Sequence, residues 1–231
     1  MSFVHMALCR AHQFSRGQDV VLLAHKSKAT DALYVDPSSP LQGCRCASAI
    51  CRVGGKLDIP TLYIFSGLPA SGKSTLAKLL SHRTGAMYVR VDTIEQGLRD
   101  LCNFKVEGEG YRLSYRIIRD NLALGLSAIS DSCNPIELTR NEWQEIAASI
   151  GAKLVNIEVR CSDATEHEYR VNTRENEIPN LNLPNWQQVQ NHYYEPWGSD
   201  VIQIDTAGQS VEDSFAELLR KLGMIPIILN K

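Results

Sequence analysis

The chain has 231 residues, of which 44% are hydrophobic and 22% charged, and its formal net charge at pH 7 is −2. This length can bury a large core, and the composition is that of a globular protein. No segment has the length and apolar purity of a transmembrane helix, and the start is too weakly apolar for a secretory signal. We therefore expect a cytoplasmic protein with no membrane partner, whose seven cysteines are free thiols.

The charge is divided unevenly along the chain. Residues 1–58 carry seven Lys/Arg and four Asp/Glu, whereas residues 59–231 carry 17 basic and 22 acidic side chains. Non-specific binding of long nucleic acid needs a basic surface. The acidic balance after residue 58 argues against such a partner and favours a small substrate.

Residues 1–58 contain one short apolar run and then a polar, turn-rich stretch, so we expect a weakly ordered N-terminal arm. Cys44, Cys46 and Cys51 cluster in this arm, but no fourth zinc ligand is nearby, and unligated thiols are the simpler interpretation. The folded pattern begins sharply at Ile59, so a translation start placed too far upstream would also explain the arm.

From residue 59 to residue 225, strand-length apolar segments alternate with segments of helical periodicity, and a short C-terminal tail, 226–231, follows. Strands are predicted at residues 61–65, 87–91, 126–130, 154–159 and 201–204. Helices are predicted at residues 73–82, 93–101, 111–124, 139–150, 163–177, 185–194 and 211–222. This alternation implies an α/β domain with a five-stranded parallel sheet that is covered on both faces.

Thr139-x-x-Glu142 matches the capping-box pattern and is expected to begin a helix, and Asp163-x-x-Glu166 is expected to begin a second, charged helix. Trp143 lies at a core position of the first of these helices. A Pro-bounded segment is rich in aromatic residues that either line a lid or substrate wall or simply pack: Trp186, Tyr193, Tyr194 and Trp197. Three histidines show no metal-ligand spacing and are assigned to the surface: His82, His167 and His192.

The most specific motif is residues 67–74, Gly-Leu-Pro-Ala-Ser-Gly-Lys-Ser, which matches G-x-x-x-x-G-K-[ST] between a predicted strand and a predicted helix. Backbone N–H groups of such a loop wrap an anion, and the helix N-terminus adds its dipole. Lys73 would supply charge to the outer phosphates, and Ser74 a hydroxyl to Mg²⁺. The alternative is an ordinary glycine-rich turn. We predict ATP binding by Gly67, Leu68, Pro69, Ala70, Ser71, Gly72, Lys73, Ser74 and Thr75.

Acidic residues follow three of the predicted strands, at the end where ligands of an open parallel sheet gather, and Asp205 is the one after the fifth strand. Asp92 follows the second strand and Asp131 the third, so two carboxylates can converge beside Lys73. We expect Asp92 to accept a proton from a substrate hydroxyl, or to orient it, and Asp131 to hold Mg²⁺ directly or through water. Each could instead cap a helix or accept a structural hydrogen bond.

Arg170 and Arg174 lie four residues apart on a predicted helix and so share a face. If this helix closes over a bound triphosphate, the two arginines would stabilise the charge that develops in phosphoryl transfer. The alternative is a solvated face on which neighbouring glutamates pair with both arginines. Arg99, seven residues after Asp92, is expected to clamp an anionic substrate.

The opening segment, Phe-Ser-Gly-Leu-Pro-Ala-Ser-Gly-Lys-Ser-Thr-Leu-Ala at residues 65–77, resembles that of small P-loop kinases. Five further segments are similar to one bacterial group of them, usually named only AAA-type ATP-binding proteins or predicted kinases: residues 91–99, 131–136, 170–174, 183–186 and 205–208. The resemblance covers about residues 60–222 and none of the arm. More distant relatives include chloramphenicol phosphotransferase, zeta toxins, gluconate kinase and the phage polynucleotide 5′-kinase domain.

The resemblance implies a P-loop NTPase three-layer sandwich with strand order 2-3-1-4-5, a helical lid, and an adenine pocket near residues 205–209. It maps the catalytic base of the wider group to Asp92, and the lid arginines that contact phosphates to Arg170 and Arg174. Several relatives carry an arginine where this chain has Glu95, which argues against copying a polynucleotide or anionic acceptor from them. Alanine also stands in the loop, at position 70, where glycine is frequent.

These observations predict a kinase, dependent on ATP and Mg²⁺, that transfers the γ-phosphate to a hydroxyl of a small-molecule acceptor. One alternative is a nucleotide-switch ATPase that acts on a protein partner, although no second domain is long enough to transmit a switch. The other is a polynucleotide 5′-kinase, which the acidic catalytic region disfavours. The sequence sets neither the acceptor nor the oligomeric state.

Overall fold

The computed structural model describes residues 59–198 and 200–225. The expected arm at 1–58, with its three clustered cysteines, and the tail at 226–231 lie outside the described residues. Within the described ranges, no helix is both long enough and apolar enough to cross a membrane.

Five parallel strands form the sheet, in the order β2-β3-β1-β4-β5. Their bounds are β1 Thr61–Ser66, β2 Met87–Arg90, β3 Ala128–Asp131, β4 Lys153–Arg160 and β5 Ile202–Asp205. The register pairs Phe65 with Asp131 on one side and with Ile157 on the other, and Asp131 pairs in turn with Arg90. Strands β1, β2 and β3 therefore end nearly level, whereas β4 and β5 extend further, to Arg160 and Asp205. The predicted parallel sheet and strand order are confirmed.

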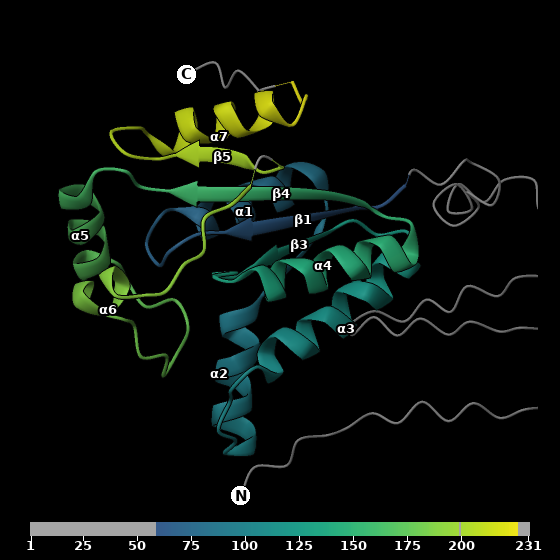
Figure 1. The fold of residues 1–231 in the computed structure, drawn as a ribbon, viewed down its shortest axis with the longest axis horizontal. Helices are drawn as coiled ribbons and strands as arrows, with labels where there is room; N and C mark the ends of the chain where they lie inside the picture. The colour runs from purple at the N-terminus through teal and green to yellow at the C-terminus, as the bar shows by residue number, and fades with distance from the viewer. Residues whose placement is uncertain (1–58, 199, 226–231) are drawn as a thin grey trace, which may run out of the picture. The chain divides into compact units, whose positions relative to one another are not determined.

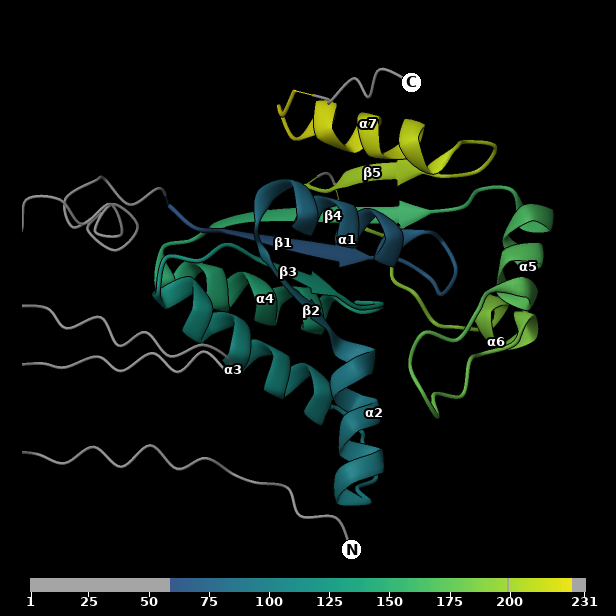
Figure 2. The ribbon, with the colours of Figure 1, turned by 180° about the vertical axis from the view of Figure 1, so that it is seen from behind.

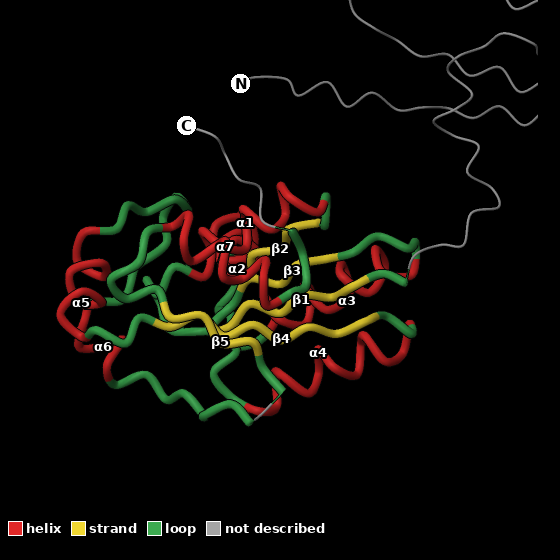
Figure 3. The backbone as a smooth tube through the Cα atoms, turned by 90° about the horizontal axis from the view of Figure 1, so that it is seen from above, coloured by secondary structure: helices red, strands yellow, loops and turns green. Residues whose placement is uncertain are grey.

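The helices lie in two layers and one separate group. Their bounds are α1 Lys73–Thr84, α2 Val91–Cys102, α3 Glu109–Ala123, α4 Glu137–Ile150, α5 Ala164–Thr173, α6 Trp186–Gln190 and α7 Val211–Lys221. Figures 1 and 2 show α1 and α7 on one face of the sheet and α3 and α4 on the other. The arrows in Figure 1 point to the C-terminal ends of the strands. Figure 3 shows α5 and α6 beyond this end of the sheet.

The alternation of side chains along β1 explains the two layers, because successive strand residues point to opposite faces. Leu62 and Ile64 belong to the buried cluster that contains Trp143 of α4. Phe65 belongs to the other cluster, with Leu76 of α1. Trp143 is fully buried, which confirms its predicted place in the core.

Of the two helix starts predicted at Thr139 and Asp163, only the one at Asp163 is confirmed. Asp163 caps α5, and its side chain accepts a hydrogen bond from the Glu166 N–H at 2.9 Å. The box expected to begin at Thr139 is wrong, because α4 already begins at Glu137. The Thr139 hydroxyl instead donates to the Ile136 carbonyl at 2.9 Å, so it satisfies an acceptor at the helix start.

Among the predicted element boundaries that shift in the structure, three bear on the site. Helix α2 begins directly after β2, so Asp92 lies in the first turn of α2 rather than between strand and helix. Helix α5 ends at Thr173 instead of near residue 177, and Arg174 is its C-cap with an extended backbone at ψ 141°. The helix expected to reach residue 194 ends at Gln190. The chain after α5 is therefore a loop that reaches over the sheet end.

A buried arginine, Arg140 of α4, ties two loops together at this end of the molecule. Only 8% of Arg140 is exposed, and its guanidinium carbon lies 4.1 Å from the centre of the Trp197 ring and 5.2 Å from that of Tyr194. The guanidinium donates to the carbonyl oxygens of Asn134, Pro135, Glu195 and Pro196. These contacts fix the β3–α4 loop against the segment that follows α6.

We predict that Arg140→Met lowers the free energy of unfolding by about 3 kcal/mol, because it leaves buried carbonyl oxygens without a donor. Arg119→Met is the matched control, since Arg119 is exposed on α3, and its change stays within about 0.5 kcal/mol. Urea unfolding of both variants measures the difference. Equal stabilities of the two variants would show that Arg140 does not hold these loops.

Candidate functional site

A cavity of about 770 Å³ opens at the C-terminal end of the strands. Nine residues that the sequence assigned to the site line it: Pro69, Ala70, Gly72, Lys73, Ser74, Thr75, Asp92, Arg170 and Arg174. The other assigned residues are not among its lining residues: Gly67, Leu68, Ser71, Arg99 and Asp131. The wall also includes residues of the segment between α5 and α6 and of the β5–α7 loop.

The loop between β1 and α1 needs glycine at its two motif positions. Gly67 has φ 137°, and a Cβ there would lie 2.1 Å from the Val159 carbonyl oxygen. The Gly67 N–H donates to the Cys133 carbonyl at 3.1 Å, which joins the loop to the residues after β3. Gly72 has φ 95° and is the N-cap of α1. The backbone therefore takes a path here that only glycine adopts at low cost.

Ala70 adopts a left-handed backbone with φ 65°, which costs an alanine about 1 kcal/mol. The preceding carbonyl, that of Pro69, accepts a hydrogen bond from Nε2–H of His167 at 2.8 Å. In a trans peptide the C=O and N–H point in opposite directions, so this bond directs the Ala70 N–H away from α5. His167 thereby fixes the orientation of one peptide unit in the loop.

The prediction that His167 lies on the surface is wrong. Only 6% of His167 is exposed, and its ring meets that of Trp186 edge to face, with centroids 5.3 Å apart. The sequence held a usable signal, because His167 precedes Arg170 by three residues and Arg174 by seven, and such spacings share a helical face. This signal lies in the helical spacing and not in any metal-ligand spacing of the histidines.

Asp131, at the end of β3, is buried with 1% exposed. Its Oδ2 accepts a hydrogen bond from the Tyr88 hydroxyl at 2.6 Å, and burial together with this carboxylate raises the pKa of Tyr88. Its Oδ1 is buried without a partner among the described residues. This free carboxylate oxygen and the hydroxyl of Ser74 are oxygen ligands of the kind that Mg²⁺ prefers.

The predicted charged groups meet around a residue that the sequence did not single out, Cys133. The pKa of its thiol is raised to about 11, foremost by burial. The charge of Lys73 lowers this pKa, and those of Asp92 and Asp131 raise it. All three charges therefore act on Cys133, a partly exposed residue that lines the cavity.

Arg170 donates three hydrogen bonds within the protein. Its guanidinium donates to the hydroxyl of Thr206 at 2.7 Å, to the Thr206 carbonyl at 2.9 Å and to the carboxylate of Glu166. The Thr206 hydroxyl in turn lies 2.9 Å from the Ser71 carbonyl. Arg170 thus joins α5 to the β5–α7 loop and, through it, to the phosphate-binding loop.

Arg174 differs from Arg170, although both line the cavity. Its Nε and Nη2 are buried without a partner among the described residues. Burial lowers its pKa most, the charge of Asp92 raises it and the charge of Arg90 lowers it again. Arg174 therefore keeps donors free beside Asp92.

The Arg99 side chain contacts residues of its own helix, α2. It donates to the Glu95 carboxylate at 3.1 Å and to the Gln96 side chain at 3.4 Å. A different arginine, Arg90, lines the cavity. Arg90 lies two residues before Asp92, at the end of β2. The sequence offers only this proximity to Asp92 as a signal for Arg90.

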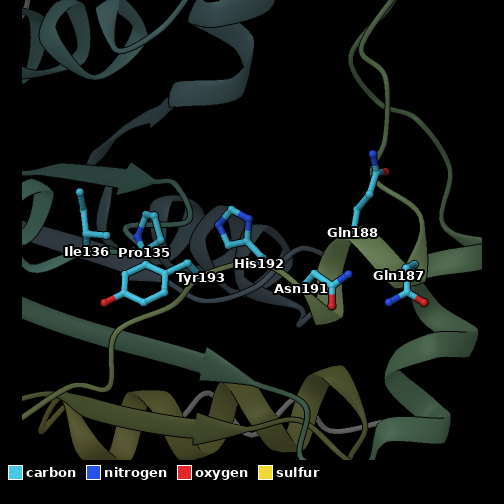
Figure 4. Close-up of a pocket in the computed structure, with 7 residues that line it drawn as sticks. All are labelled: Pro135, Ile136, Gln187, Gln188, Asn191, His192 and Tyr193. Carbon is cyan, nitrogen blue, oxygen red and sulfur yellow. The ribbon is translucent and has the colours of Figure 1, made fainter.

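A second, shallower cavity of about 540 Å³ adjoins the first. Figure 4 shows its lining residues: Pro135, Ile136, Gln187, Gln188, Asn191, His192 and Tyr193. Gln188 and His192 line both cavities, and His192 Nε2 lies 3.6 Å from the Cys133 sulfur. Gln188 and His192 therefore form a boundary that the two cavities share.

A family model described as an AAA domain matches residues 62–196, more than half of the chain. A search of curated proteins found no match. A gluconokinase from Sinorhizobium meliloti 1021 is a structural neighbour with a TM-score of 0.52 and 16% identity, and the match covers 71% of this chain and 93% of that one.

Two further neighbours were solved with nucleotides or analogues bound. The APS kinase CysC of Mycobacterium tuberculosis, in complex with AMPPNP and APS, has a TM-score of 0.54 and 15% identity over 71% of this chain and 98% of that one. Kti12 of Chaetomium thermophilum, in complex with ADP-AlF₃, has a TM-score of 0.54 and 19% identity over 70% and 97%. These likenesses show the fold, and they confirm the distant similarity to small P-loop kinases.

We predict that His167→Phe weakens the binding of Mg-AMPPNP about tenfold, because the Pro69 carbonyl loses the donor that orients its peptide. His167→Gln keeps an N–H donor and stays near the affinity of the unmodified protein. Calorimetric titration measures both affinities, and thermal unfolding reports any loss of stability separately. Equal affinities of the two variants would show that this hydrogen bond does not shape the loop.

Proposed function

The chain belongs to the AAA domain family, and from that premise we propose that it is an ATP-dependent phosphotransferase that acts on a hydroxyl of a small molecule. One observation carries this proposal: a single cavity is lined by the phosphate-binding loop with Lys73, by the carboxylate of Asp92 and by the unpaired guanidinium of Arg174. Phosphoryl transfer needs a phosphate cradle, an oriented acceptor and positive charge at the transferring group, and these residues supply all three.

In this proposal the triphosphate lies along the loop. Backbone N–H groups and the N-terminus of α1 bind its oxygens, and Lys73 adds charge at the outer phosphates. The nucleobase then lies toward Thr206 and Gln209, which line the same cavity from the β5–α7 loop. Arg170, bonded to Thr206, closes the nucleobase side, and Arg174 faces the transferring phosphate.

Ser74 and Asp131 fit a magnesium site, because one offers a hydroxyl at the start of α1 and the other a buried carboxylate oxygen that no group in the described part of the chain contacts by a hydrogen bond. A bound Mg²⁺ would neutralise charge on the phosphate oxygens. Tyr88 holds the other oxygen of Asp131 and so fixes the direction of the free one.

Asp92 would accept the proton of the acceptor hydroxyl. The acceptor oxygen then forms a bond to the γ-phosphorus, and the bond from this phosphorus to the β–γ bridging oxygen breaks. The bridging electron pair leaves with ADP, and the products are a phosphate monoester, ADP and a proton. Lys73 and Arg174 stabilise the charge that spreads over the transferring group.

We expect Lys73→Ala to lower phosphoryl transfer from ATP by on the order of a hundredfold or more, with the fold retained. Labelled ATP incubated with pooled metabolites, with a 5′-hydroxyl oligonucleotide and with buffer alone measures the transfer. These three arms separate a small-molecule kinase, a polynucleotide kinase and an acceptor-independent ATPase. Arg83→Ala, at an exposed site in the last turn of α1, is the control. Unchanged turnover in Lys73→Ala refutes the site.

We expect Asp92→Asn to keep the affinity for Mg-AMPPNP but to lower transfer about 10²- to 10⁴-fold, because the amide cannot take the hydroxyl proton. Calorimetry and the labelled-ATP assay measure the two quantities on the same preparation. Asp120→Asn, exposed on α3, should change neither. Full-rate transfer by Asp92→Asn would place the base elsewhere.

A further inference from the structure

Two arginines beside Asp92 carry buried donors that the protein does not satisfy. Among the described residues, seven buried side-chain polar atoms have no partner, and three of them are Nε of Arg90 and Nε and Nη2 of Arg174. Leaving such a donor unpaired costs about 1–3 kcal/mol, and native proteins rarely do so without a reason. Both arginines line the cavity that Asp92 lines. The free donors therefore indicate a ligand oxygen at this end of the cavity.

The charge of Asp131 acts on Arg90 and that of Asp92 acts on Arg174, but the carboxylate that hydrogen-bonds Arg90 lies at the surface. Glu177 Oε2 accepts from Arg90 at 2.7 Å and also from Lys78 at 2.5 Å, so two cations share one oxygen. The Glu177 side chain is 52% exposed and lies in the segment between α5 and α6. Salt bridges of exposed groups are weak. A ligand anion can therefore compete for Arg90.

The position of Arg90 in the sheet assigns it to the acceptor rather than to the nucleotide. The phosphate-binding loop follows β1, and β3 lies between β1 and β2. Neighbouring strands are about 4.8 Å apart, so the end of β2 lies roughly 10 Å from the end of β1. Arg90 and Asp92 come from this distant strand end together. A group bound at Arg90 would then lie beside the proton acceptor and away from the loop.

We propose that the acceptor is a small alcohol that also carries an oxyanion, a phosphate or a carboxylate, and that Arg90 binds this oxyanion with support from Arg174. This inference rests on the phosphotransferase function proposed above. A guanidinium presents paired N–H donors that match two oxygens of such a group. Arg90 then takes the role that the sequence suggested for Arg99, and Asp92 faces the hydroxyl to be phosphorylated.

The test is calorimetric titration of protein saturated with Mg-AMPPNP, because the nucleotide analogue keeps added anions away from the loop. The probes are inorganic phosphate, glycerol 3-phosphate, D-glycerate and glycerol. We expect the phosphate probes or the carboxylate probe to bind, which identifies the kind of oxyanion, and glycerol not to bind. Binding of glycerol as tightly as the anions, or binding of none of the anions, overturns the inference.

Arg90→Gln should weaken binding of the anion about tenfold, while its affinity for Mg-AMPPNP stays unchanged and shows that it is folded. Lys78→Gln is the matched control, because it removes the other partner of the same Glu177 oxygen but does not line the cavity. Anion affinity in this control should stay within about twofold. Equal losses in both variants overturn the role of Arg90.

Two experimental outcomes separate the anionic acceptor from the phosphotransferase function. If Mg-AMPPNP itself does not bind, both are refuted. If labelled phosphate from ATP is transferred to an uncharged alcohol in the pooled-metabolite assay, and this transfer needs Asp92, the phosphotransferase stands and the anionic acceptor is refuted.

Discussion

The shape of the loop between β1 and α1 is the constraint on which the site depends, and contacts from outside the loop maintain it. The Gly67 N–H is held by the Cys133 carbonyl, the Pro69 carbonyl by His167, and the Ser71 carbonyl by the Thr206 hydroxyl. These partners come from after β3, from α5 and from after β5. A backbone with three positive φ angles in a short stretch would not keep one shape alone, so the surrounding fold stabilises it.

The same contacts explain why alanine is accepted at position 70. An alanine in the left-handed region is strained by about 1 kcal/mol. The hydrogen bond from His167 fixes the adjoining peptide, and a net contribution of about 1 kcal/mol from such a bond offsets the strain. The loop and α5 are therefore one structural unit, although nearly a hundred residues separate them, and a change in α5 alters the loop directly.

The fold and the cradle could be predicted from the sequence because their signals are local. Strand-length apolar runs, helical periodicity and the spacing of Gly67, Gly72 and Lys73 each lie within one segment. Helical spacing places His167 on one face with Arg170, but the contacts that His167 and Arg90 make could not be predicted, because a histidine or arginine pattern does not say which distant backbone or cavity it will reach. The wrong boundary of α5 has a similar origin: charged residues continue past Thr173, and tertiary contacts of Glu177 hold the chain in a loop there.

Glu177 joins two features that would otherwise be independent. Its carboxylate holds the segment after α5 to Lys78 of α1 and Arg90 of β2, and these hydrogen bonds lower its pKa. The same segment carries Arg174 at its start. If an acceptor oxyanion binds Arg90, it competes with Glu177 for this guanidinium and loosens one attachment of the segment that presents Arg174. Recognition of the acceptor and placement of the arginine at the transferring phosphate would then be coupled through one shared guanidinium, because a ligand shifts an equilibrium only through contacts that differ between its two states.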